Sequence, residues 1–211
     1  MPLLHPGLYA ITDPKLLPDE RLMPAVEAAL QGGCRVIQYR DKAASQRENI
    51  YKAEQLNTLC QAFDAQLIIN DDLDLCLKIK AQGVHLGRSD GDVRMAREIL
   101  GPDYLIGVTC HDDLAYAQDC IDAGVDYCAF GRMFASLTKP EAPQCAIEIL
   151  QQACQLNCPI VAIGGINLDK LPALMHTSIH SAAVIHGLFS QADIQATAQQ
   201  FQHIFHHRLQ V

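Results

Sequence analysis

The chain has 211 residues, of which 49% are hydrophobic and 19% charged, and its formal net charge is −8. This composition excludes a disordered or fibrous protein, and the excess of acidic groups opposes a general affinity for nucleic acid or anionic membranes. We expect one globular domain over residues 1–211, in which a local pocket holds any phosphate-bearing ligand.

Targeting and redox features are sparse. The sequence has no run of roughly 18 to 20 uncharged apolar residues, and its N-terminus lacks a basic leader ahead of an apolar segment. The nine cysteines lie mostly within apolar runs without a Cys-x-x-Cys pair, which favours buried reduced thiols over a zinc or redox site. These features predict a cytoplasmic protein without membrane or nucleic-acid partners, and they leave open whether it forms a homo-oligomer.

Short runs rich in Val, Ile and Leu alternate along the chain with segments of helical periodicity. The apolar runs cover residues 7–12, 35–40, 66–70, 83–87, 104–109, 126–131, 159–165 and 182–187. The helical segments cover residues 22–31, 48–63, 74–81, 92–100, 113–123, 145–154, 168–175 and 191–207. Apolar strands that alternate with helices indicate a parallel sheet buried on both faces. Eight such pairs predict a closed (β/α)8 TIM barrel, whose functional groups gather on the loops after the strands.

Basic side chains follow the second predicted strand in the segment QYRDK. Alternation along the strand puts Gln38, Arg40 and Lys42 on one side of the chain. Arginine and lysine at a barrel mouth can clamp an anion, the first with a planar fork and the second with a point charge. A salt-bridged strand end at the surface is the alternative.

Carboxylates follow the third and fourth predicted strands. Asn70, Asp71 and Asp72 come after one strand, and Asp90 comes after the next. Two carboxylates on adjacent strands repel each other unless a cation or proton lies between them, and carboxylate oxygens suit Mg²⁺. Helix N-capping is the alternative for Asp72 and Asp90, because each precedes a helical segment.

Polar and small residues follow the remaining strands. Thr109 could donate its hydroxyl to a phosphate, His111 is either an acid–base group or a structural histidine, and Asp112 is predicted to cap a helix. The loop of residues 131–140 carries two hydroxyls and a lysine within four residues, which suits an anion. The last two strands end in IGGIN and VIHG, where TIM barrels frequently bind phosphate. The residues thus predict two phosphate-binding regions with a divalent metal at one of them.

The ordered motifs QYRDK, NDD, GVHLGRSD, GVTCH, TKPEAP, IGGI and AAVIHG resemble the thiamine phosphate synthase (thiamine-phosphate pyrophosphorylase) family over essentially the whole chain. The resemblance implies a Mg²⁺-dependent transferase of thiamine biosynthesis. Such an enzyme couples 4-amino-2-methyl-5-hydroxymethylpyrimidine diphosphate to a (carboxylated or uncarboxylated) thiazole phosphate, giving thiamine phosphate and diphosphate.

The resemblance also implies roles for individual residues. Arg40, Lys42 and Lys139 would neutralise charge on the leaving diphosphate together with Mg²⁺, and Asp71 and Asp90 would hold the metal. The substrate-binding residues that it implies are Gln38, Tyr39, Arg40, Asp41, Lys42, Asn70, Thr109, Ser136, Leu137, Thr138, Lys139, Gly165, Ile185 and His186.

Three positions depart from the family pattern, and two other functions stay open. Arg88 lies where relatives commonly have glutamine, Arg132 where they commonly have proline, and His186 where many have serine. The alternatives are a thiazole tautomerase-like isomerase, which generally lacks the paired carboxylates, and a non-catalytic binder of thiamine precursors.

Overall fold

Eight parallel strands close into a barrel in chain order in the computed structural model, which describes residues 3–135 and 143–208. Strand β8 pairs back onto β1, with Tyr9 opposite Ala183. The strands are β1 Gly7–Ile11, β2 Val36–Tyr39, β3 Gln66–Asn70, β4 Gly83–Leu86, β5 Leu105–His111, β6 Tyr127–Phe130, β7 Ile160–Ile163 and β8 Ser181–Val184. The predicted TIM barrel and the position of each predicted strand are confirmed.

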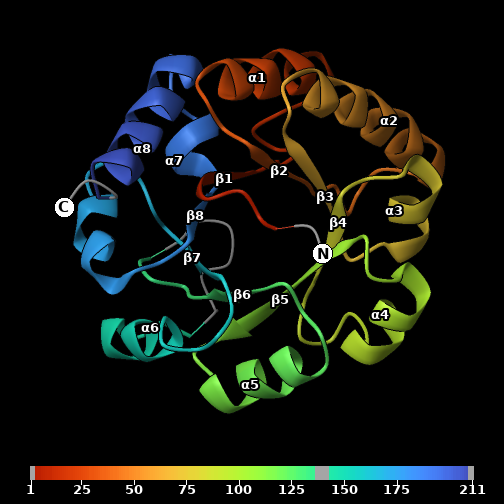
Figure 1. The fold of residues 1–211 in the computed structure, drawn as a ribbon. Coiled ribbons are helices and arrows are strands. Elements are labelled where there is room, and N and C mark those ends of the chain that lie inside the picture. The colour runs from red at the N-terminus through yellow and green to blue at the C-terminus, as the bar shows by residue number, and fades with distance from the viewer. Residues whose placement is uncertain (1–2, 136–142, 209–211) are drawn as a thin grey trace.

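Helices surround the strands on the outside of the barrel (Figure 1). They are α1 Asp19–Gln31, α2 Gln46–Ala62, α3 Leu73–Ile79, α4 Val93–Leu100, α5 Leu114–Asp122, α6 Ile147–Ala153, α7 His186–Phe189 and α8 Ile194–Arg208. The helix predicted over residues 168–175 is a 3₁₀-helix, η1 Leu171–Thr177, with a proline in its first turn. The four-residue helix α7 was not predicted, because so short a segment carries no helical period.

Aspartates cap helices α3, α4, α5 and α8, and their positions correct one prediction and exclude one alternative. The side chain of Asp72 accepts a hydrogen bond from Leu75 N at the start of α3, which confirms it as a cap. Helices α4 and α5 are capped by Asp92 and Asp113, not by Asp90 and Asp112. A capping carboxylate must reach the N–H group three residues ahead, so the helix start decides which aspartate serves. Asp90 therefore has no capping role.

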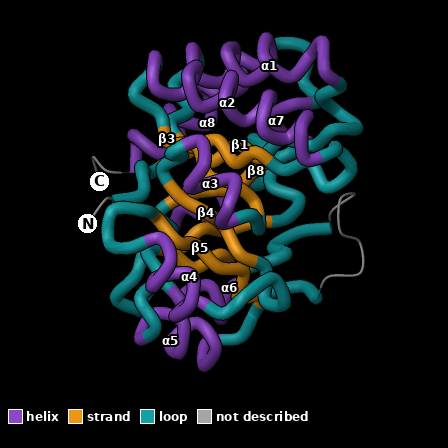
Figure 2. The backbone as a smooth tube through the Cα atoms, turned by 90° about the vertical axis from the view of Figure 1, so that its right-hand side faces the viewer, coloured by secondary structure: helices purple, strands orange, loops and turns teal. Residues whose placement is uncertain are grey.

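The apolar core has two layers. The larger layer lies between the strands and the helices, and the smaller fills the barrel interior with residues such as Tyr9, Ile68 and Tyr127. Leu4, which belongs to the inner layer, lies next to Gln66 and His180, which hydrogen-bond the backbone of Leu3 and Leu4. The N-terminal segment thereby closes the end of the barrel where the strands begin. In side view the strands occupy the centre of the molecule and the helices its outside (Figure 2).

The cysteines are mostly buried thiols, as their positions within apolar runs predict. All nine cysteines are free thiols, and seven of them are buried. Burial raises the pKa of the Cys34 thiol to about 11 and that of Cys60 to about 12, which disfavours the reactive thiolate. Within residues 3–135 and 143–208, no helix is long and apolar enough to cross a membrane.

Candidate active site

A cavity of about 390 Å³ opens where the strands end. Its walls come from every part of the barrel, including Tyr9 and Ile11 of β1, His85 of β4 and Val161 of β7. This is the end of the barrel at which TIM-barrel enzymes carry their active sites. Among the predicted site residues, those that line it are Gln38, Arg40, Asn70, Thr109, Gly165, Ile185 and His186.

The strand alternation of β2 divides the predicted segment QYRDK into two sets. Gln38 and Arg40 face the cavity, whereas Tyr39 packs in the layer between strands and helices and donates its hydroxyl to Asn49 Oδ1 at 2.7 Å. Asp41 Oδ1 accepts hydrogen bonds at 3.1 Å from the backbone N–H groups of Ala43 and Ala44. The side chains of Tyr39 and Asp41 thus lie outside the cavity lining, as do those of Lys42, Asp71 and Asp90. The substrate and metal roles implied for these residues stay predictions.

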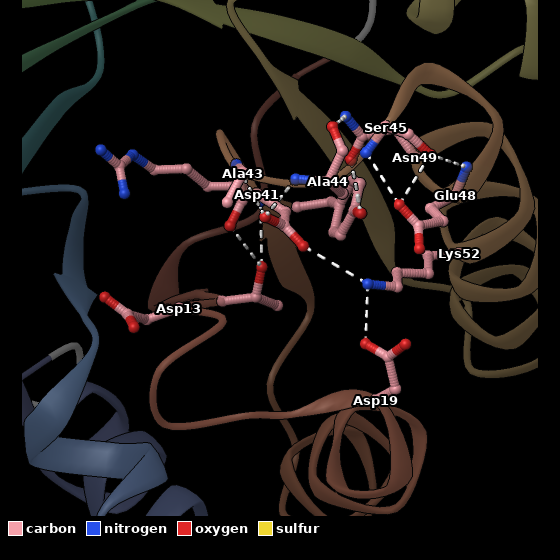
Figure 3. A network of polar contacts seen from close by, with 12 residues as sticks. Asp13, Asp19, Asp41, Ala43, Ala44, Ser45, Glu48, Asn49 and Lys52 are labelled. Carbon is pink, nitrogen blue, oxygen red and sulfur yellow. Dashed lines mark hydrogen bonds and ion pairs between the residues drawn. The ribbon is translucent and has the colours of Figure 1, made fainter.

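A partly buried lysine fixes the loop that carries these residues (Figure 3). Lys52 Nζ of α2 lies 2.7 Å from Asp19 Oδ1 of α1 and 3.4 Å from Asp41 Oδ2. The hydrogen bond that Lys52 donates to Asp19 is the largest influence on the pKa of Lys52, and it raises that pKa, so the ammonium form is favoured. On the other side of the loop, Arg40 N donates to Thr12 Oγ1 at 2.9 Å. These contacts hold the end of β2 against β1 and α2, and they fix the position from which Arg40 reaches the cavity.

Asp71 accepts three hydrogen bonds at the mouth. Lys42 Nζ lies 2.8 Å and Asn70 Nδ2 2.6 Å from Asp71 Oδ2, while Gly87 N lies 3.3 Å from Oδ1. Burial raises the pKa of the Asp71 carboxyl, but the ammonium of Lys42 and the N–H groups outweigh burial, and the pKa lies below its ordinary value. The residue adopts a left-handed φ of 62°. Asp71 is therefore an ionised carboxylate with a fixed orientation.

The carboxylates of Asp90 and Asp71 both contact Gly87. A methyl group at Gly87 would overlap Asp90 Oδ2, so this carboxylate rests directly against the residue whose N–H binds Asp71. Two carboxylates from adjacent loops fit Mg²⁺, which usually takes one or two protein carboxylates and completes its shell with water and phosphate oxygens. In the described part of the chain, no cluster of three or more His, Cys, Asp or Glu side chains could enclose a metal by itself. A metal at this position would therefore need ligands from a substrate or from water.

Arg88 points away from this pair of carboxylates. Its guanidinium lies 2.8 Å from Asp113 Oδ2 and 4.5 Å from the centre of the Tyr116 ring. The hydrogen bond from Tyr116 N and the contact with Arg88 lower the pKa of the Asp113 carboxyl. The extra cation at this position is thus neutralised by the cap of α5 and leaves the Asp71–Asp90 pair unaltered.

The loop after β6 is packed onto the loop after β7. Met133 N and Phe134 N donate to the carbonyls of Ile163 and Gly164 at 2.9 and 3.0 Å. Gly165 has a φ of 64°, and a methyl group on it would overlap the Ala135 carbonyl, so only glycine fits there. The predicted ligands Ser136, Leu137, Thr138 and Lys139 follow Ala135 and lie outside the described residues.

Several side chains of the cavity were not predicted. Tyr9, Tyr127 and His85 form a hydrogen-bonded group on its floor, and Arg132 and Lys170 line its rim. Lys170 Nζ lies 3.3 Å from the Gly165 carbonyl and 5.3 Å from the centre of the Phe134 ring. Lys170 lies inside the helix predicted over residues 168–175, but the structure begins this helix at Leu171 and leaves Lys170 in the loop after β7. Its place five residues after the seventh predicted strand is a signal that could have identified it. The floor residues lie within apolar runs, where the sequence alone indicates packing.

Known proteins that resemble this chain share both its barrel and its length. The model of the family described as thiamine monophosphate synthase matches residues 8–188. A thiamine-phosphate synthase of Alcanivorax borkumensis is 52% identical over 211 residues, which is 97% of each chain. One of Marinobacter nauticus is 46% identical over 98% of this chain and 95% of its own.

Solved structures agree with the sequence relatives. A thiamine phosphate pyrophosphorylase from Pyrococcus furiosus superimposes with a TM-score of 0.88 at 31% identity, over 96% of both chains. The family model covers most of the chain, and the sequence relatives cover nearly all of it. The chain therefore belongs to the thiamine monophosphate synthase family.

Proposed function

We propose that this protein is a thiamine-phosphate synthase, a transferase that joins a pyrimidine diphosphate to a thiazole phosphate and releases diphosphate. The observation that carries the proposal is the cavity that places Arg40, Asn70 and Thr109 together at the barrel mouth, in a chain of this family. The two phosphorylated substrates are a pyrimidine with an activated methylene and a thiazole whose ring nitrogen attacks that methylene.

The leaving diphosphate would be held at the mouth beside β2, β3 and β4. As the carbon–oxygen bond breaks, negative charge grows on the departing oxygen, and fixed cations stabilise it more strongly than mobile water does. Arg40 lines the cavity, and Lys42 Nζ lies 2.8 Å from Asp71 Oδ2, with its side chain 56% exposed. Both cations would face the departing diphosphate. Lys139, by family resemblance, would be a third cation. No protein nucleophile is needed, because the pyrimidine amino group stabilises the carbocation-like species.

Magnesium is part of the proposal. Asp71 and Asp90, which flank Gly87, would hold the ion, and when bound it would supply Lewis-acid neutralisation of the diphosphate charge. Lys42 and Asn70 already direct Asp71 Oδ2, so the orientation of this carboxylate does not depend on a ligand.

The thiazole phosphate would lie on the opposite side of the cavity. Gly165, Ile185 and His186 line it there, and α7 begins at His186. The loops after the last two strands, followed by a short extra helix, are the usual phosphate site of TIM barrels. Because the contacts at this end can come from backbone N–H groups, His186 can replace the serine common among relatives without loss of the site.

The test is a synthesis assay with the purified protein, both phosphorylated substrates, and Mg²⁺ either present or chelated. We expect thiamine phosphate only with Mg²⁺, and a severe loss of activity in Asp71→Asn. Asp74→Asn is the matched control, since it removes an exposed carboxylate from the same segment and should stay active. Full activity of Asp71→Asn at limiting Mg²⁺ would remove the metal assignment.

The same assay distinguishes the two alternatives. An isomerase would convert the thiazole phosphate without consuming the pyrimidine diphosphate. A binder would retain both compounds unchanged while still giving a binding isotherm for each. Absence of thiamine phosphate from the wild-type protein, in the presence of Mg²⁺ and both substrates, would refute the synthase assignment.

A further inference from the structure

A chain of hydrogen bonds crosses the floor of the cavity from one wall of the barrel to the other. Gln38 Nε2 donates to Tyr9 OH at 2.8 Å, and Tyr9 OH lies 2.8 Å from Tyr127 OH. Tyr127 OH lies 3.1 Å from His85 Nδ1, and His85 Nε2 lies 2.9 Å from Thr109 Oγ1. The chain therefore connects β2, β1, β6, β4 and β5 in turn.

These groups are shielded from bulk water. Tyr9 and Tyr127 are 1% and 0% exposed, and Gln38 and His85 are 3% and 8% exposed. The His85 ring also stacks on Tyr127 with an interplanar angle of 26°. Buried polar groups need defined partners, since an unmatched donor or acceptor costs about 1–3 kcal/mol. The hydrogen atoms along the chain must therefore be arranged consistently.

The amide of Gln38 sets the donor-to-acceptor direction of the whole hydrogen-bond chain. Because the Tyr9 hydroxyl accepts from Gln38 Nε2, its single hydrogen is available for Tyr127. Tyr127 then accepts from Tyr9 and donates to His85 Nδ1. A neutral imidazole that accepts at Nδ1 carries its hydrogen on Nε2, which donates to Thr109 Oγ1.

Thr109, the last residue of the hydrogen-bond chain, has a hydroxyl hydrogen that is not used within it. Thr109 accepts from His85, so its own hydroxyl hydrogen must find a different acceptor, and it makes no hydrogen bond to another residue in the described part of the chain. Thr109 lines the cavity. In the reverse direction Thr109 would donate to His85, and only its lone pairs would face a bound anion, which they would repel. The direction of the chain thus decides whether this hydroxyl attracts or repels an anion.

We propose that Tyr9, Tyr127 and His85 are positioning residues that orient the Thr109 hydroxyl as a donor toward an anionic oxygen in the cavity. The identity of that oxygen, on the leaving diphosphate, rests on the proposed function. The direction of the hydrogen-bond chain does not rest on the proposed function, because it follows from the ligand-free structure alone. This group gives residues inside apolar strands a role beyond packing.

The direct test is the tautomer of His85, measured by NMR of the ligand-free protein labelled with ¹⁵N-histidine. The signal is identified by its loss in His85→Asn. We expect hydrogen on Nε2 and an unprotonated, acceptor Nδ1. Hydrogen on Nδ1 instead would mean that the chain runs the other way, and it would overturn the proposal whether or not the protein has synthase activity.

Two conservative variants interrupt the chain upstream of His85. Tyr9→Phe and Tyr127→Phe keep the ring and remove the hydroxyl, so His85 should become a mixture of tautomers. Because charge on the leaving oxygen grows in the transition state, kcat should fall roughly 10- to 100-fold with little change in KM, less than the ~100- to 1,000-fold of losing a direct donor. Tyr104→Phe, a partly buried tyrosine ahead of β5, is the matched control and should alter neither quantity.

A double-mutant cycle tests whether Tyr127 acts through Thr109. Thr109→Val removes the hydroxyl, so adding Tyr127→Phe should reduce kcat no further. Independent, multiplicative losses in the double variant would show that Tyr127 works by another route and would refute the positioning role. If wild-type protein lacks synthase activity, the proposed function fails, and the His85 tautomer still decides the direction of the chain.

Discussion

Gly87 offers a way to disturb the proposed metal site without changing a ligand. Its N–H binds Asp71, and the carboxylate of Asp90 rests where a side chain would begin. Real Cβ contacts are not closer than 3.0 Å, and a methyl group at Gly87 would lie well inside that limit from Asp90 Oδ2. In Gly87→Ala the carboxylate must therefore move by roughly 1 Å.

That displacement is large compared with the tolerance of the metal. Mg²⁺ requires oxygen ligands at about 2.0–2.1 Å in a nearly ideal octahedron, so a shift of roughly 1 Å removes or distorts one bond. Outer residues that orient a metal ligand are typically worth about 10- to 100-fold in affinity, or about 1.4–2.7 kcal/mol. We expect the Mg²⁺ concentration for half-maximal activity to rise by that factor in Gly87→Ala. The backbone N–H to Asp71 is retained, and Asp90 is exposed, so stability should change by less than about 0.5 kcal/mol.

The measurements are Mg²⁺ dependence of synthesis and calorimetric titration of Mg²⁺ in the presence of diphosphate. Asp90→Asn should give a similar loss. Asp92→Asn is the matched control, because it removes a charge from the same loop and asparagine still caps α4. Wild-type Mg²⁺ affinity in Gly87→Ala, alongside a clear loss in Asp90→Asn, would refute the steric argument. Wild-type affinity in Asp90→Asn would remove Asp90 from the site.

Two further predictions concern stability. Arg97→Met should cost about 3 kcal/mol of unfolding free energy in urea titration, because it leaves the buried Asp126 carboxylate without its ion pair at 2.6 Å, whereas the exposed Arg94→Met should cost under about 0.5 kcal/mol. Burial lowers the pKa of His180 below 6.5, so the unfolded chain binds more protons there. Stability should fall as the pH drops below about 6.5, and His180→Asn should flatten this fall in urea midpoints; an unchanged slope would contradict the assignment.

The periodicity of the sequence was sufficient for the barrel and for the end of it that carries the site. Alternation along β2 correctly placed Gln38 and Arg40 on the cavity side, whereas Lys42, which was predicted with them, does not line the cavity. Helix starts were less accurate, because several aspartates precede each helix: the cap of α5 is Asp113 and not the predicted Asp112, and the cap of α4 is Asp92, which excludes the capping alternative for Asp90. That difference matters for function, since it leaves the Asp90 carboxylate available for a metal.

The floor of the cavity shows why other residues escaped prediction. Tyr9 and Tyr127 are 118 positions apart, and each looks like a core residue within an apolar strand. Their polar role exists only because β1 and β6 face each other across the barrel and His85 stands between them and Thr109. A one-dimensional pattern records which face a residue occupies. The pattern does not show which hydroxyl of another strand contacts that residue inside the barrel.

The charge distribution explains how an acidic protein can hold two phosphorylated ligands. The net charge of −8 repels anions at long range, yet Arg40, Arg132 and Lys170 all line one cavity. Screening limits the effect of distant surface charges to about 8–10 Å at physiological salt, whereas a partly enclosed cavity keeps its local field. Added salt should therefore weaken substrate capture only modestly, and neutralising Lys170 should raise the KM of one substrate more than that of the other. Equal effects on both substrates would mean that the cavity has one shared anion-binding site and not two separate ones.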